Sequence, residues 1–103
     1  MIQSIPFTND PYQELVVDWK GNSLEFIVFW NDQASCWFFN LNDYISGTTL
    51  ANGIALVPGT DLLKPLALDI EGSLFINDEN NTGSNPTQDG LGTDFMVYLT
   101  DEL

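Results

Sequence analysis

The sequence predicts an all-β fold, either a small antiparallel β-sandwich or an open barrel of roughly six to eight short strands, with at most one short helix. Two observations support this fold class. Several short runs alternate between apolar and polar residues, with large aromatics among the apolar ones, and clusters of Gly, Asn, Asp and Pro separate the runs. A chain of 103 residues is long enough for one core, so residues 1–103 are expected to form a single domain.

Three consecutive runs predict an antiparallel meander. Tyr12–Trp19 alternates apolar residues with polar or acidic ones, which is typical of a half-buried strand. Residues 20–22 include Gly and Asn, which tolerate the positive φ of a tight hairpin turn, and residues 23–30 resume the alternation. After a polar turn at residues 31–33, residues 36–41 supply the third strand.

The middle of the chain leaves one alternative open. Residues 48–57 include the dipeptide Asn52-Gly53, which predicts either a tight hairpin or a bulge within one longer strand. Residues 61–68 are the one place where a helical turn is expected, with Asp61 as its cap. Pro65 prevents a long helix there.

Two further strands are expected near the C-terminus. Residues 72–77 and residues 95–99 both alternate between two faces. The segment between them, residues 78–94, is polar and much longer than a typical connection, so we expect a long loop.

The N-terminal segment, residues 1–10, is a candidate arm. Residues 2–7 form a short apolar strip ahead of a turn, which predicts either an edge strand of the chain's own sheet or an arm that pairs with a neighbouring chain. If the strip contacts another subunit, its deletion is expected to leave the isolated fold largely intact. The residues expected at such a subunit interface are Ile2, Ile5, Pro6, Phe7 and Trp19.

The aromatic residues suggest both a core and a contact surface. By strand parity Trp30 shares a face with Phe26, and Trp37 shares a face with Phe39, so both tryptophans are expected inside. Trp19 lies beside a turn and is expected to be partly exposed.

Two segments of the meander, residues 26–30 and residues 36–39, are apolar on both sides. They must be covered either by a second sheet and loops or by another subunit, and a chain this small has difficulty covering both faces itself. We therefore expect a homo-oligomer. The only cysteine, Cys36, lies within the second segment and is expected to be a small buried hydrophobe.

The composition excludes several functions. Fifteen acidic residues against two lysines, with no Arg or His, give a net charge of −13, whereas a nucleic-acid binder needs clustered cations. Without His there is no Ser–His or Cys–His pair, and no glycine-rich phosphate loop occurs, so we expect no catalytic residues and no cofactor. The sequence shows neither a signal peptide nor an apolar run of about 20 residues, so neither export nor membrane insertion is expected.

The segment from residue 78 to residue 89 partly matches a calcium-binding loop, in which oxygen donors at fixed offsets surround a glycine turn. The donors at the matching offsets are Asp78, Asn80, Thr82 and Asp89. The last of these is shorter than the usual Glu, and strands rather than helices flank the loop. We therefore expect an ordinary polar loop without a metal, with calcium binding as the alternative.

Taken together, a series of segments in this order resembles the baseplate plug proteins of contractile-tailed phages, specifically the cyanophage-type plug family. The similarity covers nearly the whole chain. The segments are Ile5-Pro6-Phe7, Asn9-Asp10-Pro11-Tyr12-Gln13, Lys20-Gly21, Trp30-Asn31, Trp37, Gly53-Ile54-Ala55-Leu56-Val57, Asp61-Leu62-Leu63, Pro86-Thr87, Leu91-Gly92-Thr93 and Val97-Tyr98-Leu99-Thr100.

The resemblance implies a non-enzymatic virion structural protein, made in the host cytoplasm and located in the central hub of the tail baseplate. There it would help to close the tail lumen and would assemble with hub, spike or tail tube proteins. Baseplate hubs have rotational symmetry, so the resemblance also implies ring-like association, for which we expect three-fold symmetry. The alternative function from the residues alone is a free-standing β-sandwich module that binds calcium or carbohydrate.

Overall fold

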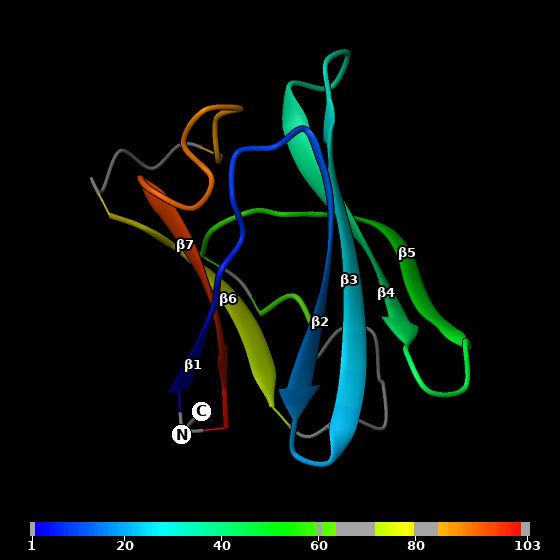
Figure 1. Cartoon of the computed structure of the whole chain (residues 1–103). Coiled ribbons are helices and arrows are strands. Elements are labelled where there is room, and N and C mark those ends of the chain that lie inside the picture. The colour runs from blue at the N-terminus through cyan, green and yellow to red at the C-terminus, as the bar shows by residue number, and fades with distance from the viewer. Residues whose placement is uncertain (1, 60, 64–71, 80–84, 102–103) are drawn as a thin grey trace.

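Seven strands form two antiparallel sheets in the computed structural model, which describes residues 2–59, 61–63, 72–79 and 85–101. The strands are β1 (Ile2–Ile5), β2 (Tyr12–Trp19), β3 (Asn22–Asn31), β4 (Cys36–Asp43), β5 (Thr49–Ala55), β6 (Ser73–Asp78) and β7 (Phe95–Thr100). One sheet has the order β2-β3-β4-β5 and the other the order β1-β7-β6, and they lie side by side in Figure 1. The predicted all-β fold is confirmed, and the described residues form two sheets consistent with a small sandwich, without a closed barrel.

The predicted meander is confirmed as β2, β3 and β4. Lys20 and Gly21 connect β2 to β3 with φ values of 50° and 81°, the positive angles that a tight hairpin requires. Between β3 and β4, the side-chain oxygen of Asn31 accepts hydrogen bonds from the backbone N–H groups of Gln33 and Ala34, at 3.0 Å and 3.1 Å. Side-chain acceptors of this kind hold a turn in place without help from the sheet.

The dipeptide Asn52-Gly53 forms a bulge rather than a hairpin. Residues 49–55 make one strand, and its pairing with β4 shifts register on either side of Leu41. Gly53 has a φ of 64°, and its N–H donates to the side-chain oxygen of Asn40 at 2.7 Å. The bulge therefore lies at the free edge of the four-stranded sheet.

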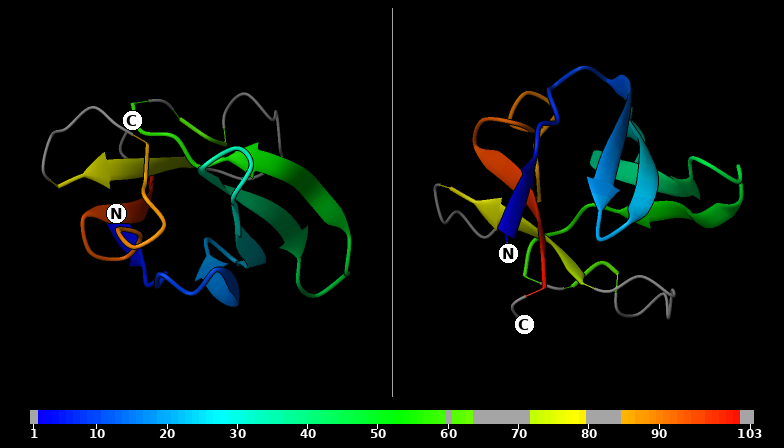
Figure 2. Two further views of the ribbon diagram at one scale, coloured as in Figure 1. Left: turned by 90° about the horizontal axis from the view of Figure 1, so that it is seen from above. Right: turned by 60° about the horizontal axis from the view of Figure 1, so that its bottom comes forward.

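The N-terminal strip is an edge strand of the chain's own sheet. β1 pairs antiparallel with β7, from Ile2 opposite Thr100 to Ile5 opposite Val97, so β7 lies between β1 and β6. This resolves the alternative between an intramolecular strand and an arm that reaches another chain. Figure 2 shows β6 and β7 together on one side of the molecule, with β4 and β5 on the other.

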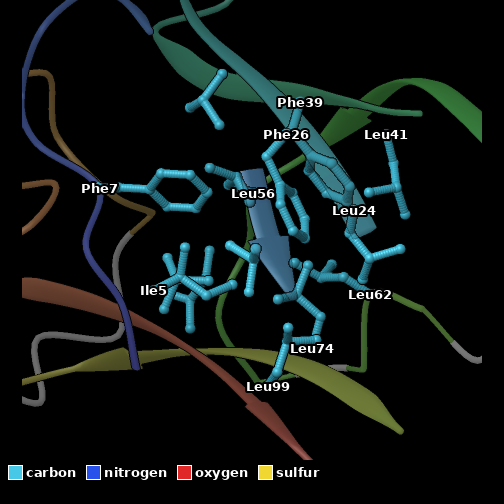
Figure 3. Packing of buried hydrophobic residues seen from close by; sticks show 14 of the residues in the cluster. Ile5, Phe7, Leu24, Phe26, Phe39, Leu41, Leu56, Leu62, Leu74 and Leu99 are labelled. Atoms are coloured by element: carbon cyan, nitrogen blue, oxygen red, sulfur yellow. The ribbon is translucent and has the colours of Figure 1, made fainter. Parts of the chain in front are cut away.

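The core lies between the two sheets and contains residues from near both ends of the chain. Phe7 is 5% exposed and meets Phe26 edge to face, with ring centroids 5.8 Å apart, and Phe26 in turn lies 5.9 Å from Phe39. Leu74 and Leu99 approach the same cluster from the three-stranded sheet (Figure 3). Because Ile5 and Phe7 are part of this core, their burial argues against the expectation that the strip can be deleted without harm to the fold.

The described part of the long loop before β7 folds back onto the sandwich. The indole N–H of Trp37 donates to the backbone oxygen of Thr87 at 2.9 Å, and Leu91 is 1% exposed. Gly92 lies against the backbone of Phe7, so closely that a Cβ on this residue would come within 2.3 Å of the Phe7 carbonyl oxygen. The segment 85–94 is therefore anchored to the core at several points.

The helical turn predicted for residues 61–68 falls mostly outside the described residues. Within them, the Asp61 carboxylate accepts hydrogen bonds from the backbone N–H groups of Leu63 and Leu74, at 2.9 Å and 3.3 Å, and so connects this segment to β6. No helix of membrane-spanning length and apolar character occurs in the described part of the chain.

An ion pair links the two sheets at one end of the sandwich. Lys20, in the β2–β3 turn, pairs with Asp101, which directly follows β7. The hydrogen bond from Lys20 lowers the pKa of Asp101 from 3.8 to about 2. The lowered pKa means that ionised Asp101 stabilises the fold fully above pH 3.8, and that this contribution disappears as the pH falls through about 2.

The Asp101→Asn variant tests this link. At pH 7 we expect a small decrease in melting temperature relative to the parent protein, because the pair is close to the surface. The difference should shrink as the pH falls from about 4 to about 2, since the parent loses the charged carboxylate too. Thermal melts followed by circular dichroism across this range measure it. If the parent and the variant differ in melting temperature by the same amount at pH 7 and at pH 2, the charge of Asp101 does not contribute to stability.

Candidate interaction surface

The outward side of the four-stranded sheet presents a row of aromatic residues. Strand register places Tyr12 opposite Phe29, Phe29 opposite Phe38, and Phe38 opposite Ala55, so the row crosses all four strands. The rings of Phe29 and Phe38 stack with centroids 6.1 Å apart and planes 23° apart. Tyr12 is 58% exposed, and the two phenylalanines are half-buried. The row is therefore an apolar strip open to solvent.

The next two rows along the sheet, beyond the aromatic row, combine apolar residues with carboxylates. Glu14 is opposite Ile27, and Val16, which is 43% exposed, is opposite Glu25. Glu25 accepts a hydrogen bond from the Asn42 amide at 3.1 Å. We call this surface the aromatic face; its residues are Tyr12, Glu14, Val16, Asp18, Glu25, Ile27, Phe29 and Phe38.

The outward side of the three-stranded sheet has a different character. Its strand positions contain no charged residue, in a chain with a net charge of −13. We call this surface the uncharged face; its residues are Ile2, Ser4, Ser73, Phe75, Asn77, Met96, Tyr98 and Thr100. A shallow depression of about 340 Å³ lies on it, lined by Ile2, Phe75, Asn77, Tyr98 and Thr100.

Neither face is needed to complete the core, which already lies between the sheets. Contiguous apolar patches that remain exposed on a small domain usually mark contact sites for another protein. Both faces also lie on regular strands, which hold their side chains in a fixed arrangement. The arrangement is suited to binding two different protein surfaces.

The five residues expected at a subunit interface are divided by the structure. Ile2 is 63% exposed and belongs to the uncharged face, and Pro6 is also exposed. Ile5, Phe7 and Trp19 are buried in the chain's own core, where they pack between the sheets. A contact with another subunit therefore stays a prediction for Ile2 and Pro6, which alone among the five present their side chains to solvent.

The expectation that Trp19 is partly exposed is wrong. Its side chain is 1% exposed, and Gly72, which directly precedes β6, lies close against the indole. Trp37 is fully buried, as predicted, while Trp30 is only partly buried and packs edge to face on it with centroids 5.6 Å apart. The indole N–H of Trp30 donates to the Asp32 carboxylate at 2.6 Å. No tryptophan therefore forms an exposed platform for a sugar in the described residues.

The calcium-loop prediction falls partly outside the described residues, which exclude Asn80 and Thr82. Asp78 ends β6 and is half-buried, whereas Asp89 is exposed in the loop before β7. Within the part of the chain that the structure describes, no three Cys, Asp or Glu side chains gather closely enough to hold a metal ion.

Cys36 is buried, as predicted, at the start of β4. Burial raises the pKa of its thiol, and a backbone hydrogen bond with Trp37 lowers it by a smaller amount. A high pKa keeps the group as a thiol, which is a poor nucleophile. This cysteine therefore has a packing role.

The sequence indicated only part of this surface. The two-sided apolar character of residues 26–30 and 36–39 pointed to Phe29 and Phe38. Tyr12 was missed, although its parity with Val16 places both on one side of β2. The uncharged face was missed entirely, because it depends on β1 and β6 pairing with opposite sides of β7.

A comparison with known protein families finds a match over nearly the whole chain. The family model described as the cyanophage baseplate Pam3 plug gp18 matches residues 2–102, nearly the whole chain. A search of the curated proteins found no match. The match confirms the resemblance seen in the sequence. The chain thus belongs to the cyanophage baseplate plug family and is a structural component of the virion tail baseplate.

Proposed function

We propose that this protein is a non-enzymatic plug in the central hub of a contractile tail baseplate, where it helps to close the tail lumen before ejection. The observation that carries the proposal is that both outward sheet faces keep exposed apolar side chains, such as Tyr12, Val16 and Ile2, after the core is complete. A component surrounded by other proteins needs such faces, whereas a free-standing domain is normally polar on its outside.

The acidic composition also supports a place in the lumen. DNA must pass the hub during ejection, and a surface with net charge −13 repels it rather than binding it. At physiological ionic strength the repulsion extends only about 8 Å, so it acts where DNA passes close to the protein. A plug with this charge closes the channel without adhering to the DNA.

We further propose that the plug associates with itself as a three-fold ring, with the uncharged face as one side of each contact. A ring contact joins two different patches of neighbouring subunits, so the uncharged face would meet a second patch on the next copy. In a chain this acidic, most surfaces would bring like charges together, and the uncharged face avoids that cost. Ile2 and Pro6, at the edge of this sheet, are the predicted subunit contacts of the N-terminal strip.

The Ile2→Glu variant tests self-association. Light scattering coupled to size-exclusion chromatography should give the mass of three chains for the parent. For the variant, the apparent dissociation constant should rise at least about tenfold, because a carboxylate would be buried in an apolar contact. Ile45→Glu is the matched control, since Ile45 is 80% exposed in the β4–β5 loop. A parent mass of one chain would contradict the ring.

The closing of the lumen is tested with particles assembled without this protein. The fraction of packaged DNA that becomes accessible to added nuclease should be clearly larger than in complete particles. Supplying the protein during assembly should restore protection. Full protection in its absence would remove the plug from the proposal and leave a structural role only.

A further inference from the structure

The aromatic face combines an apolar strip with carboxylates that nothing on the same sheet neutralises. We propose that this face docks a basic protein surface of a different chain, and not a second copy of this one. The inference rests on the proposed function, since it names the chemistry of a partner that the plug meets in the baseplate.

The row that crosses β2 to β5 supplies the apolar part of the face. Tyr12 is the most exposed aromatic of the face, at 58%, and Val16 lies four residues further along, on the same side of β2. Exposed tyrosines on a rigid surface commonly supply much of the binding energy of an interface. The stacked pair of Phe29 and Phe38 gives the partner a flat apolar surface in the centre.

The carboxylates of the face specify the chemistry of the partner. Glu14 and Glu25 lie in the two rows next to the aromatic one, and Asp18 follows at the end of the sheet. A protein that covers the aromatic row also takes these carboxylates out of water, which is costly unless it brings cations. Arginine fits best, because its planar guanidinium binds a carboxylate through two parallel hydrogen bonds.

A second copy of this chain is a poor source of those cations. The chain has two lysines against fifteen acidic residues, and no Arg or His. Lys20 is paired with Asp101, Lys64 lies outside the described residues, and no outward strand position of either sheet holds a basic residue. Packing the aromatic face on a copy would bring unpaired carboxylates into an interface between two chains of charge −13. Charge complementarity therefore selects a basic partner.

The test is incorporation of variants into particles, with each variant supplied to phage that lacks the gene. Glu14→Lys should lower the number of copies per particle about tenfold, because it opposes a cation on the partner. Quantitative mass spectrometry of purified particles measures the copies relative to the tail tube protein. Asp89→Lys is the matched control, since it makes the same charge change in an exposed loop outside both faces, and it should incorporate normally.

Tyr12→Ser provides a second variant that removes an exposed ring without changing charge, and it should also reduce incorporation. Both variants are expected to melt within a few degrees of the parent, which excludes misfolding. Normal incorporation of both overturns the inference. Weakened self-association of Glu14→Lys in light scattering also overturns it, because the occupant would then be a second copy. If the parent itself is absent from particles, the proposed function fails; if the parent is present and the variants behave like it, only this inference fails.

Discussion

A variant that lacks residues 2–7 is expected to be largely unfolded at 25 °C. The deletion removes β1 from its sheet and takes Ile5 and Phe7, which are 1% and 5% exposed, out of the core. Truncating one large buried apolar side chain costs about 2–5 kcal/mol, and a whole domain is stable by only about 5–15 kcal/mol. Losing two such side chains and a strand therefore removes most of the free energy of unfolding.

Urea denaturation followed by tryptophan fluorescence measures this loss. The control is Ile2→Ser, which changes an exposed residue of the same strand and should alter the free energy of unfolding by about 0.5 kcal/mol or less. A truncated protein that still unfolds cooperatively near the parent's midpoint would mean that the strip is not part of the core. Its assignment as an external arm would then stand.

Gly92→Ala is expected to destabilise the protein by about 3 kcal/mol or more, which combines two separate costs. The residue has a φ of 88°, a conformation that L residues rarely adopt. The added Cβ would also lie 2.3 Å from the carbonyl oxygen of Phe7, so either the loop or the segment after β1 must move. The shift in urea midpoint at constant slope gives the change in stability.

Gly21→Ala separates the two costs. Gly21 has a similar φ of 81°, but nothing lies within 4 Å of the Cβ that alanine would add. Its substitution should cost only the backbone strain, about 1–2 kcal/mol. If Gly92→Ala and Gly21→Ala destabilise the protein equally, the contact with Phe7 is less close than the structure indicates.

The strands of the meander could be predicted because their information is local. Period-two alternation in Tyr12–Trp19 and in residues 23–30 directly specifies which side chains share a face, and Gly21 marks the turn between them. The burial of Trp19 could not be predicted in the same way. Trp19 is followed along the chain by a turn, whereas Gly72, which lies against its indole, is more than fifty residues away and directly precedes β6.

The N-terminal strip shows the same limit more strongly. Residues 2–7 read as an edge strand, but composition alone does not identify the strand that they pair with. The partner, β7, is more than ninety residues away, and pairing within a chain uses the same backbone hydrogen bonds as pairing between chains. The register therefore had to come from the structure.

Of the two outward faces, only the aromatic face could be anticipated from the sequence, again because its signal is local. Residues that are apolar on both sides of a strand, such as Phe29 and Phe38, already signal an uncovered face in a chain this small. The uncharged face has no comparable local signal, since Ile2, Phe75 and Tyr98 come from three separate segments. What they share is a lack of charge, which becomes meaningful only when they are seen side by side.

The bulge at Gly53 has a consequence for strand pairing at the edges of its sheet. A straight, regular sheet edge accepts further strands without limit and promotes growth into fibres. The kink in β5 interrupts the backbone groups at one edge of its sheet, and Glu14 and Asp18 place charge along the strand at the opposite edge. Both features discourage open-ended strand pairing at the edges of this sheet.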